Sequence, residues 1–599
     1  MNFKDALRTL FFKDTKQFAN NQLYTSWGEN LDPERVLEEY PRPQLRRDNY
    51  TILNGYWDYS ITAVETRPEI YEGKILVPFS PESVLSGVGR QLKPGECLWY
   101  QRSIELDQIP VGKRLILHFG AVDQSCEVYM NDDKVAEHQG GYLPFSIDIT
   151  GDVKVGKNLL TVKVIDVSDT SYHSRGKQKL SRGGMFYTAQ SGIWQTVWYE
   201  WVPNTYITGI KLTPKLKQSE LELIIYLNDS LDERRQEQTY QVAIIKEGKV
   251  VQETSSNERS ITISLPEVIC WSPENPFLYG LDIIVGDDRI QSYFAMRSVE
   301  LKKDEAGITR IYLNHKPYFQ NGLLDQGYWP DGLYTAPCDE AMIYDIEQAK
   351  ALGFNMLRKH IKIEPLRWYY HCDRLGMLVW QDMVNGGEDY NQLLVGYLPT
   401  IVPGIAGRFK DRHYKLLGRE SREGRREWCI ECRRTVELLY NCPSIVVWVP
   451  FNEGWGQFDA KEAYQLIREL DSTRLIDHAS GWFDQGIGDF ESIHNYFHPL
   501  KVKLKDRAVI FSEIGGYACY ITGHSFSWKV YGYKIFLTKE DFDEAYQRLY
   551  RTELAKLHEQ GLSAVVFTQL SDVEDEVNGL FTYDRKVCKV TKLTDWMKG

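Results

Sequence analysis

Several features that define other classes of protein are missing from this sequence of 599 residues. No apolar run reaches the length of about 20 residues that a transmembrane helix needs. Residues 1–23 lack the apolar core and the small-residue cleavage site of a signal peptide. The formal net charge is −12 and no basic tract stands out, which argues against a nucleic-acid partner. We therefore expect a cytoplasmic protein that binds neither membranes nor nucleic acid.

Cysteine is sparse, with ten residues that mostly lie in apolar or strand-like stretches. One CxxC pair, Cys429 and Cys432, lies in a charged helical stretch, and no second pair follows at the spacing of a zinc site. Two cysteines one helical turn apart are the simpler interpretation. We expect reduced thiols, as in intracellular proteins, and neither a metal nor another cofactor.

Aromatic residues are plentiful, with 16 tryptophans and 37 tyrosines. Their flat faces stack on sugar rings, but they also fill hydrophobic cores, so composition alone leaves both roles open. The length is too great for one hydrophobic core and predicts three or four domains.

The first 303 residues predict an arm and two β-sandwiches. Residues 1–45 are a polar N-terminal arm, in which Phe3, Leu7, Leu10 and Phe11 have helical spacing. From residue 46 the hydrophobic period becomes two, and short strands separated by turn residues predict a jelly-roll, sugar-binding-type β-sandwich over residues 46–202. Further alternating strands predict an immunoglobulin-like β-sandwich over residues 203–303.

Residues 304–599 change pattern, because short apolar strands now alternate with helical stretches, as in parallel βα units. Eight strands predict a C-terminal TIM (β/α)8 barrel, with its chemistry at the C-terminal strand ends. The expected strands are residues 317–323, 355–360, 377–381, 445–451, 474–478, 492–496, 508–513 and 564–569. An insertion from about residue 385 to 425 is either a lid over the barrel mouth or a solvated surface excursion.

Two of these strands end in the same way, with a glutamate followed by glycines. Glu453 follows the apolar run that begins at Ile445, and Glu513 follows the run that begins at Ala508. Both emerge on one rim of the predicted barrel, where two carboxyl groups about 5–5.5 Å apart would support hydrolysis with retention. An apolar wall would raise the pKa of Glu453 and suit it as the general acid, while Glu513 would be the nucleophile.

With these residues identified, the chain resembles glycoside hydrolase family 2, which contains β-galactosidases, β-glucuronidases and β-mannosidases. The resemblance covers nearly the whole length. It rests on the stretches 53–57, 140–145, 191–197, 271–279, 294–298, 443–453 and 512–513. It assigns the acid/base to Glu453 and the nucleophile to Glu513. It also implies that Asn452 contacts the sugar 2-hydroxyl.

Further site residues are predicted from their positions at strand ends. Tyr496 is expected to donate to Glu513, and Arg358 to pair with it and depress its pKa, with His360 beside it. His494 is a lesser candidate. Trp455, Trp482 and Trp380 are either stacking platforms or core. The candidates for sugar hydroxyls are Asp325, Asp382 and Gln569.

Departures from the family pattern leave the sugar open. Residues 322–330 replace the family's Asn-Arg-His-Glu-like run, and the Asn-x-Lys pair that reads a uronate carboxylate in glucuronidases is absent after Glu513. Our hypothesis is a retaining exo-β-glycosidase that acts on an oligosaccharide or glycoside, with a β-galactoside or related sugar ahead of β-mannoside, arabinoside, galactofuranoside or uronide. A non-catalytic carbohydrate-binding protein and a transglycosidase remain alternatives, and so does homo-oligomerisation.

Overall fold

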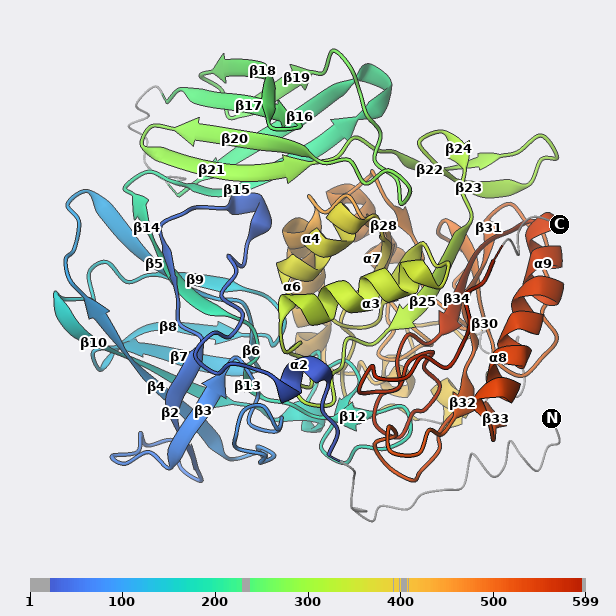
Figure 1. The fold of residues 1–599 in the computed structure, drawn as a ribbon, viewed down its shortest axis with the longest axis horizontal. Coiled ribbons are helices and arrows are strands. Elements are labelled where there is room, and N and C mark those ends of the chain that lie inside the picture. Colours follow the sequence, from blue (N-terminus) through green and yellow to red (C-terminus); the bar gives the residue numbers. More distant parts are fainter. Residues whose placement is uncertain are drawn as a thin grey trace.

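The N-terminal third of the chain folds into two antiparallel sheets that pack face to face (Figure 1). The computed structural model describes residues 22–228, 238–391, 393–397, 399, 407 and 409–594, so the predicted helix around Phe3 to Phe11 lies outside the described residues. A six-stranded sheet has the order β3-β2-β4-β10-β7-β8 and a four-stranded sheet the order β1-β14-β5-β9. Their alternating apolar residues, among them Trp57, Leu117 and Val162, form one core between the sheets.

The strands of this sandwich have the following bounds: β1 Tyr50–Ile52, β2 Gly55–Thr62, β3 Gly73–Val77, β4 Cys97–Leu106, β5 Lys113–Phe119, β7 Ser125–Met130, β8 Asp133–Gln139, β9 Phe145–Asp148, β10 Gly156–Ile165 and β14 Val197–Pro203. Short pairs add β6 Val122–Asp123 with β13 Gly192–Ile193, and β11 Gln178–Lys179 with β12 Tyr187–Thr188. The segment that carries β11 and β12 leaves the sandwich and runs toward the barrel (Figure 1).

A second sandwich packs a three-stranded sheet, β15-β16-β19, on a four-stranded sheet, β18-β17-β20-β21. Its strands are β15 Ile207–Lys215, β16 Glu220–Leu227, β17 Tyr240–Lys246, β18 Lys249–Ser256, β19 Ser260–Ser264, β20 Tyr279–Val285 and β21 Asp288–Phe294. The hairpin sheet β22 Val299–Lys303, β23 Thr309–Leu313 and β24 Lys316–Pro317 then leads into the barrel. β14 ends at Pro203, one residue beyond the predicted first range, and the β22–β23 hairpin crosses the predicted limit at residue 303, so the domain limits stay proposals.

The C-terminal half is a parallel eight-stranded sheet in the order β29-β28-β27-β26-β25-β34-β31-β30. Its strands are β25 Gln320–Asp325, β26 Met356–Lys359, β27 Leu378–Asp382, β28 Ile445–Val449, β29 Leu475–Ile476, β30 Phe490–Asn495, β31 Ala508–Gly515 and β34 Leu562–Thr568. This is the strand order of a (β/α)8 barrel that is nearly closed, and the predicted fold class is confirmed. Strands that are buried on both faces explain the uninterrupted apolar runs in the sequence.

The helices that cover the barrel are α3 Asp339–Ala351, α4 Leu366–Leu375, α6 Arg422–Leu439, α7 Ala460–Leu470, α8 Lys539–Arg548 and α9 Ala555–Glu559. Smaller elements are α2 Ser26–Glu29, η1 Pro43–Leu45, η2 Ser168–Thr170, η3 Leu216–Gln218, η4 Leu393–Tyr397, η6 Tyr414–Leu417, β32 Tyr517–Cys519, β33 Lys534–Phe536 and η7 Leu549–Leu554. The sequence pattern suggested a helix after every strand, but the described segments 477–489 and 496–507 contain none. These two connections are instead built from turns and extended chain.

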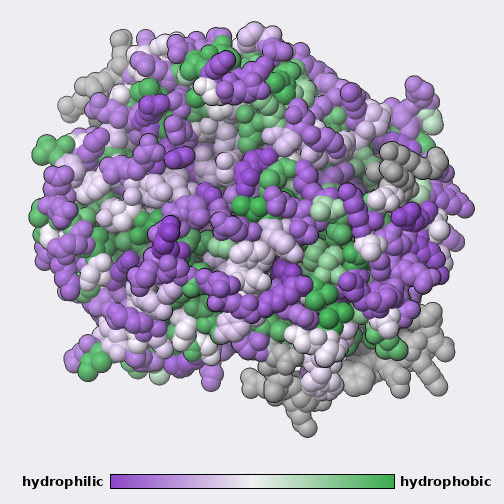
Figure 2. Space-filling view, in the orientation of Figure 1, coloured by the Kyte–Doolittle hydropathy of each residue, from purple (hydrophilic) through white to green (hydrophobic). Residues whose placement is uncertain are grey.

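The surface in Figure 2 mixes hydrophilic and hydrophobic side chains across the face shown. Large apolar side chains that are strongly exposed, such as Val111 and Leu537, lie in different parts of the fold. Single exposed apolar residues of this kind are ordinary on globular proteins. No helix in the described part of the chain is long and apolar enough to cross a membrane.

Candidate active site

Glu453 and Glu513 reach the same rim of the barrel by different routes. Glu513 lies near the C-terminal end of β31, so its side chain is placed by a regular strand. Glu453 follows β28 in a loop where its backbone N–H donates to the carbonyl oxygen of Ser480 at 2.9 Å. Its φ of 53° is left-handed, a conformation that residues other than glycine rarely adopt and that clusters at functional sites.

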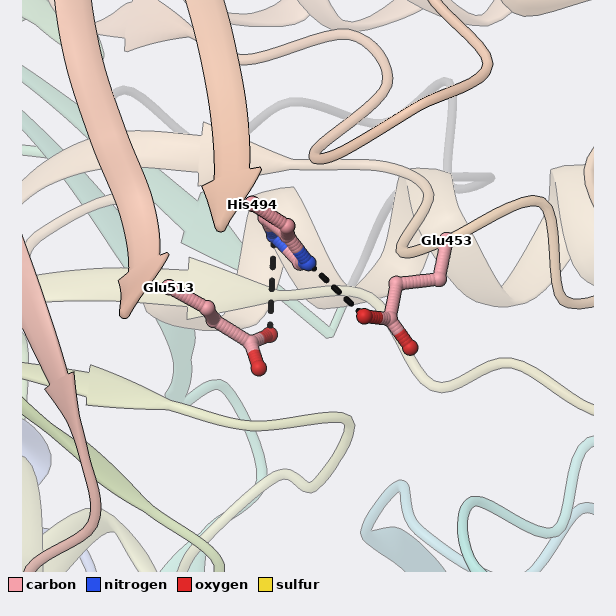
Figure 3. Close-up of side chains that lie close together, drawn as sticks. All are labelled: Glu453, His494 and Glu513. Carbon is pink, nitrogen blue, oxygen red and sulfur yellow. Dashed lines mark hydrogen bonds and ion pairs between the residues drawn. The ribbon is translucent and has the colours of Figure 1, made fainter. Parts of the chain in front are cut away.

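His494, at the end of β30, lies between the two glutamates (Figure 3). Its Nδ1 is 2.8 Å from Oε1 of Glu453, and its Nε2 is 3.7 Å from Oε1 of Glu513. Nε2 also lies 2.9 Å from the hydroxyl oxygen of Ser480. One atom from each of the three side chains can be chosen so that all lie within 4.8 Å of one another. The two carboxylates therefore face one shared space.

Glu513 is held in its ionised form by two donors. Arg358, at the end of β26, donates from Nη1 to Oε1 at 3.1 Å, and the hydroxyl of Tyr496 donates to Oε2. Burial alone would raise the pKa of Glu513, but His494 and Arg358 outweigh burial and lower this pKa to about 2. Burial and the neighbouring carboxylate raise the pKa of Tyr496 well above its ordinary value, so the phenol stays a donor.

Glu453 is shifted in the opposite direction. Burial raises its pKa above the ordinary value, and the nearby charge of Glu513 adds to this, although the hydrogen bond to His494 acts against it. In the described part of the chain, its Oε2 has no hydrogen-bond partner and is available to carry a proton. Two neighbouring carboxyl groups therefore have pKa values shifted in opposite directions, which is the arrangement that acid/base chemistry uses.

Arg358 is the centre of a buried network beneath the glutamates. Its Nε and Nη2 donate to the two oxygens of Asp382, each at 3.0 Å, and Nη2 also donates to Oδ1 of Asn452 at 2.9 Å. His360 places Nδ1 2.7 Å from Oδ2 of Asp382, and burial lowers the pKa of this histidine well below its ordinary value. Asp382 thus orients Arg358 and His360, and its carboxylate is occupied by them.

The same network fixes the amide of Asn452. Because Oδ1 of Asn452 accepts from Arg358, the Nδ2 group must point away from it, and Nδ2 is buried with no partner in the described structure. Buried donors are normally paired, so this amide beside the two glutamates is available to a ligand. A sugar hydroxyl next to the reacting carbon would satisfy it.

Trp380, one of the predicted site residues, lies away from the barrel mouth. Trp380 is fully buried in the barrel core, stacks on Phe490 and donates from its indole N–H to Gln320, so it is not a platform at the mouth. It precedes Asp382 by two residues in β27 and therefore lies one layer deeper.

Asp325 and Gln569 lie near the rim, but their polar atoms are already bonded. Asp325 accepts from Lys359 at 2.6 Å and from the backbone of Gly327 at 2.9 Å. The side-chain amide of Gln569 accepts from Gln326 and donates to Asn578, at 2.8 and 2.7 Å. We therefore no longer propose these two residues as direct sugar ligands.

Trp482 contacts the histidine between the glutamates, and Trp455 follows Glu453 by two residues. Trp482 packs edge-on against His494, with ring centroids 5.5 Å apart. Trp455 is stacked with Tyr390 of the 385–425 insertion and contacts Phe186 of the sandwich segment. The described part of the insertion thus packs against the site, and its function as a lid stays a prediction.

Two residues of the site, His494 and Lys177, could not be ranked correctly from the sequence. His494 was a lesser candidate, although the alternating burial of β30 points it to the same side as Ser492, toward the barrel interior. Lys177 was not considered at all, because it belongs to the first sandwich. Its charge acts on Glu453, Glu513 and His360. No local sequence signal marks a residue that another domain delivers.

Glu453, His494 and Glu513 form the one group in the described ranges with the composition and spacing to hold a metal ion. Two carboxylates and one imidazole suit several divalent metals, so these residues alone do not select one. The expectation of metal independence stays a prediction.

Comparison with models of known protein families shows which family the chain belongs to. Residues 90–201 match the model for the sugar binding domain of glycosyl hydrolases family 2, and residues 299–508 match the model for the TIM barrel domain of the same family. The chain belongs to glycoside hydrolase family 2.

Relatives within family 2 have more than one specificity in their names. The chain is 26% identical over 394 residues to a beta-galactosidase of Thermoanaerobacter pseudethanolicus, an alignment that covers 63% of this chain and 47% of that protein. It is 28% identical over 299 residues to a putative beta-glucuronidase of Formosa agariphila, covering 48% and 34%. The chain thus spans less than half the length of these curated relatives.

Solved structures of family 2 share the fold over nearly the whole chain. A beta-D-glucuronidase of Dictyoglomus thermophilum superposes with a TM-score of 0.70 at 18% identity, covering 92% of this chain and 96% of that one. A beta-glucuronidase from an uncultured Clostridium gives a TM-score of 0.69 at 18% identity, with 91% and 97% covered. At this identity the likeness concerns the fold alone.

Proposed function

We propose that the protein is a retaining β-glycosidase that removes a terminal sugar from an oligosaccharide or glycoside by double displacement. Glu513 is the nucleophile and Glu453 is the acid/base residue. The proposal rests on one observation above all. One carboxylate oxygen of Glu453 lies within 4.8 Å of one carboxylate oxygen of Glu513. The pKa values of the two groups are shifted in opposite directions.

The first half of the reaction forms a covalent intermediate. An oxygen of ionised Glu513 attacks the anomeric carbon, and protonated Glu453 gives its proton to the glycosidic oxygen as that bond breaks. The aglycone leaves as an alcohol, and the sugar stays on Glu513 as an ester. Arg358 and Tyr496 keep the attacking carboxylate ionised and fixed before the attack.

The second half releases the sugar with its original configuration. Glu453, now ionised, removes a proton from a water molecule, and the resulting oxygen attacks the anomeric carbon on the face that the aglycone left. The bond to Glu513 breaks, and its carboxylate returns to Arg358 and Tyr496. The free Nδ2 group of Asn452 supports the proposal, because it can donate to the 2-hydroxyl as positive charge develops on the ring.

For the substrate we propose a β-galactoside or a closely related sugar. The names of the relatives, beta-galactosidase and putative beta-glucuronidase, support this class and leave the substituent at C6 open. Exo action is proposed because the buried glutamates favour a pocket that takes one terminal ring.

The test is a panel of 4-nitrophenyl glycosides that includes galactosides, glucosides, mannosides, arabinosides, galactofuranosides and uronides. Glu513→Gln and Glu453→Gln are each expected to reduce turnover of the best substrate by roughly 10²–10⁴-fold or more. The matched control is Glu462→Gln on the exposed side of α7, which should keep parental turnover.

Product analysis separates hydrolysis from its competitors. Proton NMR of the first product should show the β-anomer, which then equilibrates. An α-anomer as first product would contradict double displacement. Transfer of the sugar to an added alcohol in preference to water would show a transglycosidase, and sugar binding without turnover of any glycoside would show a binding protein.

A further inference from the structure

Lys177 belongs to the first sandwich but is fixed against the barrel. The backbone N–H of Gly176 donates to the carbonyl of Asn385 at 2.7 Å, and Ser174 forms a β-bridge with Gly386. On the other side, Nε2 of Gln178 donates to Asp123 at 3.0 Å inside the sandwich. The lysine therefore sits between two anchored neighbours, one on each domain.

The contact with the barrel is too close to accommodate a larger residue before Lys177. A Cβ added at Gly176, whose φ is 63°, would lie 2.9 Å from the carbonyl oxygen of Ile361. Ile361 directly follows His360 of the site. The backbone of the sandwich segment thus touches the chain just after β26, next to His360 of the site.

The side chain of Lys177 is more than nine-tenths buried and has no counter-ion in the described part of the chain, while its Nζ keeps some exposure. The residue is 7% exposed, and its Nζ lies 5.4 Å from the ring centre of Trp455 and 5.7 Å from that of Tyr187. Within the described part of the chain, Nζ makes neither a hydrogen bond nor an ion pair. Aromatic faces attract a cation, but they leave all three of its N–H donors unused.

The carboxylates that Lys177 faces are already committed. Glu513 accepts from Arg358 and Tyr496, and Glu453 is bonded to His494 and carries the catalytic proton in the proposed mechanism. An unpaired buried charge is costly, so a site that keeps one is arranged for an anion that arrives with the ligand. Nζ lies 5.4 Å from the ring centre of Trp455, which follows Glu453 by two residues, and the charge acts on both glutamates and on His360, so the lysine lies beside the catalytic candidates.

We infer that Lys177 is a specificity residue that binds an anionic substituent on the terminal sugar, so that the enzyme prefers acidic sugars over their neutral counterparts. The inference rests on the proposed function, because it uses the same pocket. The shared chemistry is a singly charged oxyanion, either the carboxylate of a uronic acid or a sulfate ester. The lysine comes from the sandwich, so it is distinct from the Asn-x-Lys pair that this sequence lacks after Glu513.

The experiment compares substrates that differ only in charge. The kcat/KM values of 4-nitrophenyl β-D-galacturonide, 4-nitrophenyl β-D-galactoside and its 6-sulfate are measured for the parent, together with the corresponding glucuronide and glucoside. A higher value for one acidic member of a pair is expected. The uronide and sulfate arms show which anion the site takes.

The variant is Lys177→Met, which keeps an unbranched apolar stem over Trp455. It should lower kcat/KM for the preferred acidic substrate by about 10–100-fold, because a charge-assisted hydrogen bond is lost, and change the neutral substrate less than about threefold. Lys177→Arg should retain part of the preference. The control is Lys179→Met, whose ammonium lies over Phe186 at 4.6 Å on the same segment.

Two results would overturn the inference while leaving the proposed function intact. One is a parent that cleaves the neutral member of each pair as well as the acidic one. The other is an equal loss on both members in Lys177→Met, which would show that the lysine supports catalysis through the glutamates alone and does not bind an anionic substituent. If the parent cleaves no glycoside at all, the proposed function fails. The affinities of the protein for galacturonate and for galactose, each measured by calorimetric titration, then test Lys177 separately. Equal affinities would overturn the inference.

Discussion

Removing the imidazole of His494 should move the alkaline limb of the pH–rate profile to higher pH. His494 bonds Oε1 of Glu453 at 2.8 Å and lowers the pKa of that carboxyl group, against the larger effect of burial. Hydrogen bonds to charged groups contribute about 1.5–3 kcal/mol. Because 1.36 kcal/mol displaces a titration by one unit, His494→Phe should shift the limb upward by about one to two pH units.

The sign follows from the protonation state that the reaction needs. Activity requires protonated Glu453 and ionised Glu513, so the rate falls as pH rises through the pKa of Glu453. Loss of the bond stabilises the protonated form, which extends activity to higher pH. Loss of His494 also raises the pKa of Glu513, but that pKa starts at about 2, so the acid limb stays far below neutrality.

The assay is kcat/KM for the best nitrophenyl glycoside between pH 4 and pH 10, with Ser480→Ala as the comparison. That variant removes the partner of Nε2, 2.9 Å away, and leaves the bond to Glu453 in place, so it should shift the limb much less. An alkaline limb that stays fixed or moves down in His494→Phe would refute the reasoning. It would mean that Glu453 does not control this limb.

Two further predictions concern backbone strain at Glu453 and metal binding. Glu453→Gly should have a higher melting temperature than Glu453→Ala, because left-handed backbone at φ 53° costs about 1–2 kcal/mol for residues with a Cβ. Both variants should lack activity, and equal melting temperatures in a thermal scan would show that the strain is absent. Dialysis against EDTA should leave turnover unchanged, whereas a loss restored by a divalent metal would show that Glu453, His494 and Glu513 act as ligands.

The proximity of Glu453 and Glu513 could be predicted from sequence because it depends on a simple topological rule. Apolar runs that end in Glu453 and Glu513 are strands of one parallel barrel, and the C-terminal ends of such strands share a rim. Arg358 and Tyr496 follow from the same rule and do contact Glu513. Their roles in catalysis stay proposals.

Whether a strand-end residue is available to a ligand could not be predicted, because that depends on which neighbours its polar atoms bond. Asp325 and Gln569 are at strand ends, yet Lys359 and Asn578 occupy their polar atoms. Trp380 is only two residues before a rim position, and that step along the strand moves it into the core. The absence of helices from the described connections after β29 and β30 could not be predicted either, because short polar connections and short helices have similar composition.

The sandwich segment around Lys177 that packs against the barrel has a consequence for how substrate preference can evolve. In the proposed mechanism, bond cleavage depends on Glu453 in the loop after β28 and on Glu513 in β31, whereas Lys177 lies in a segment more than 200 residues earlier in the chain. Mutations in that segment can alter which sugars are accepted without touching the residues that break the bond. Conversely, a barrel excised by itself would keep its glutamates and lose part of its selectivity, so the two regions should be inherited and engineered as a unit.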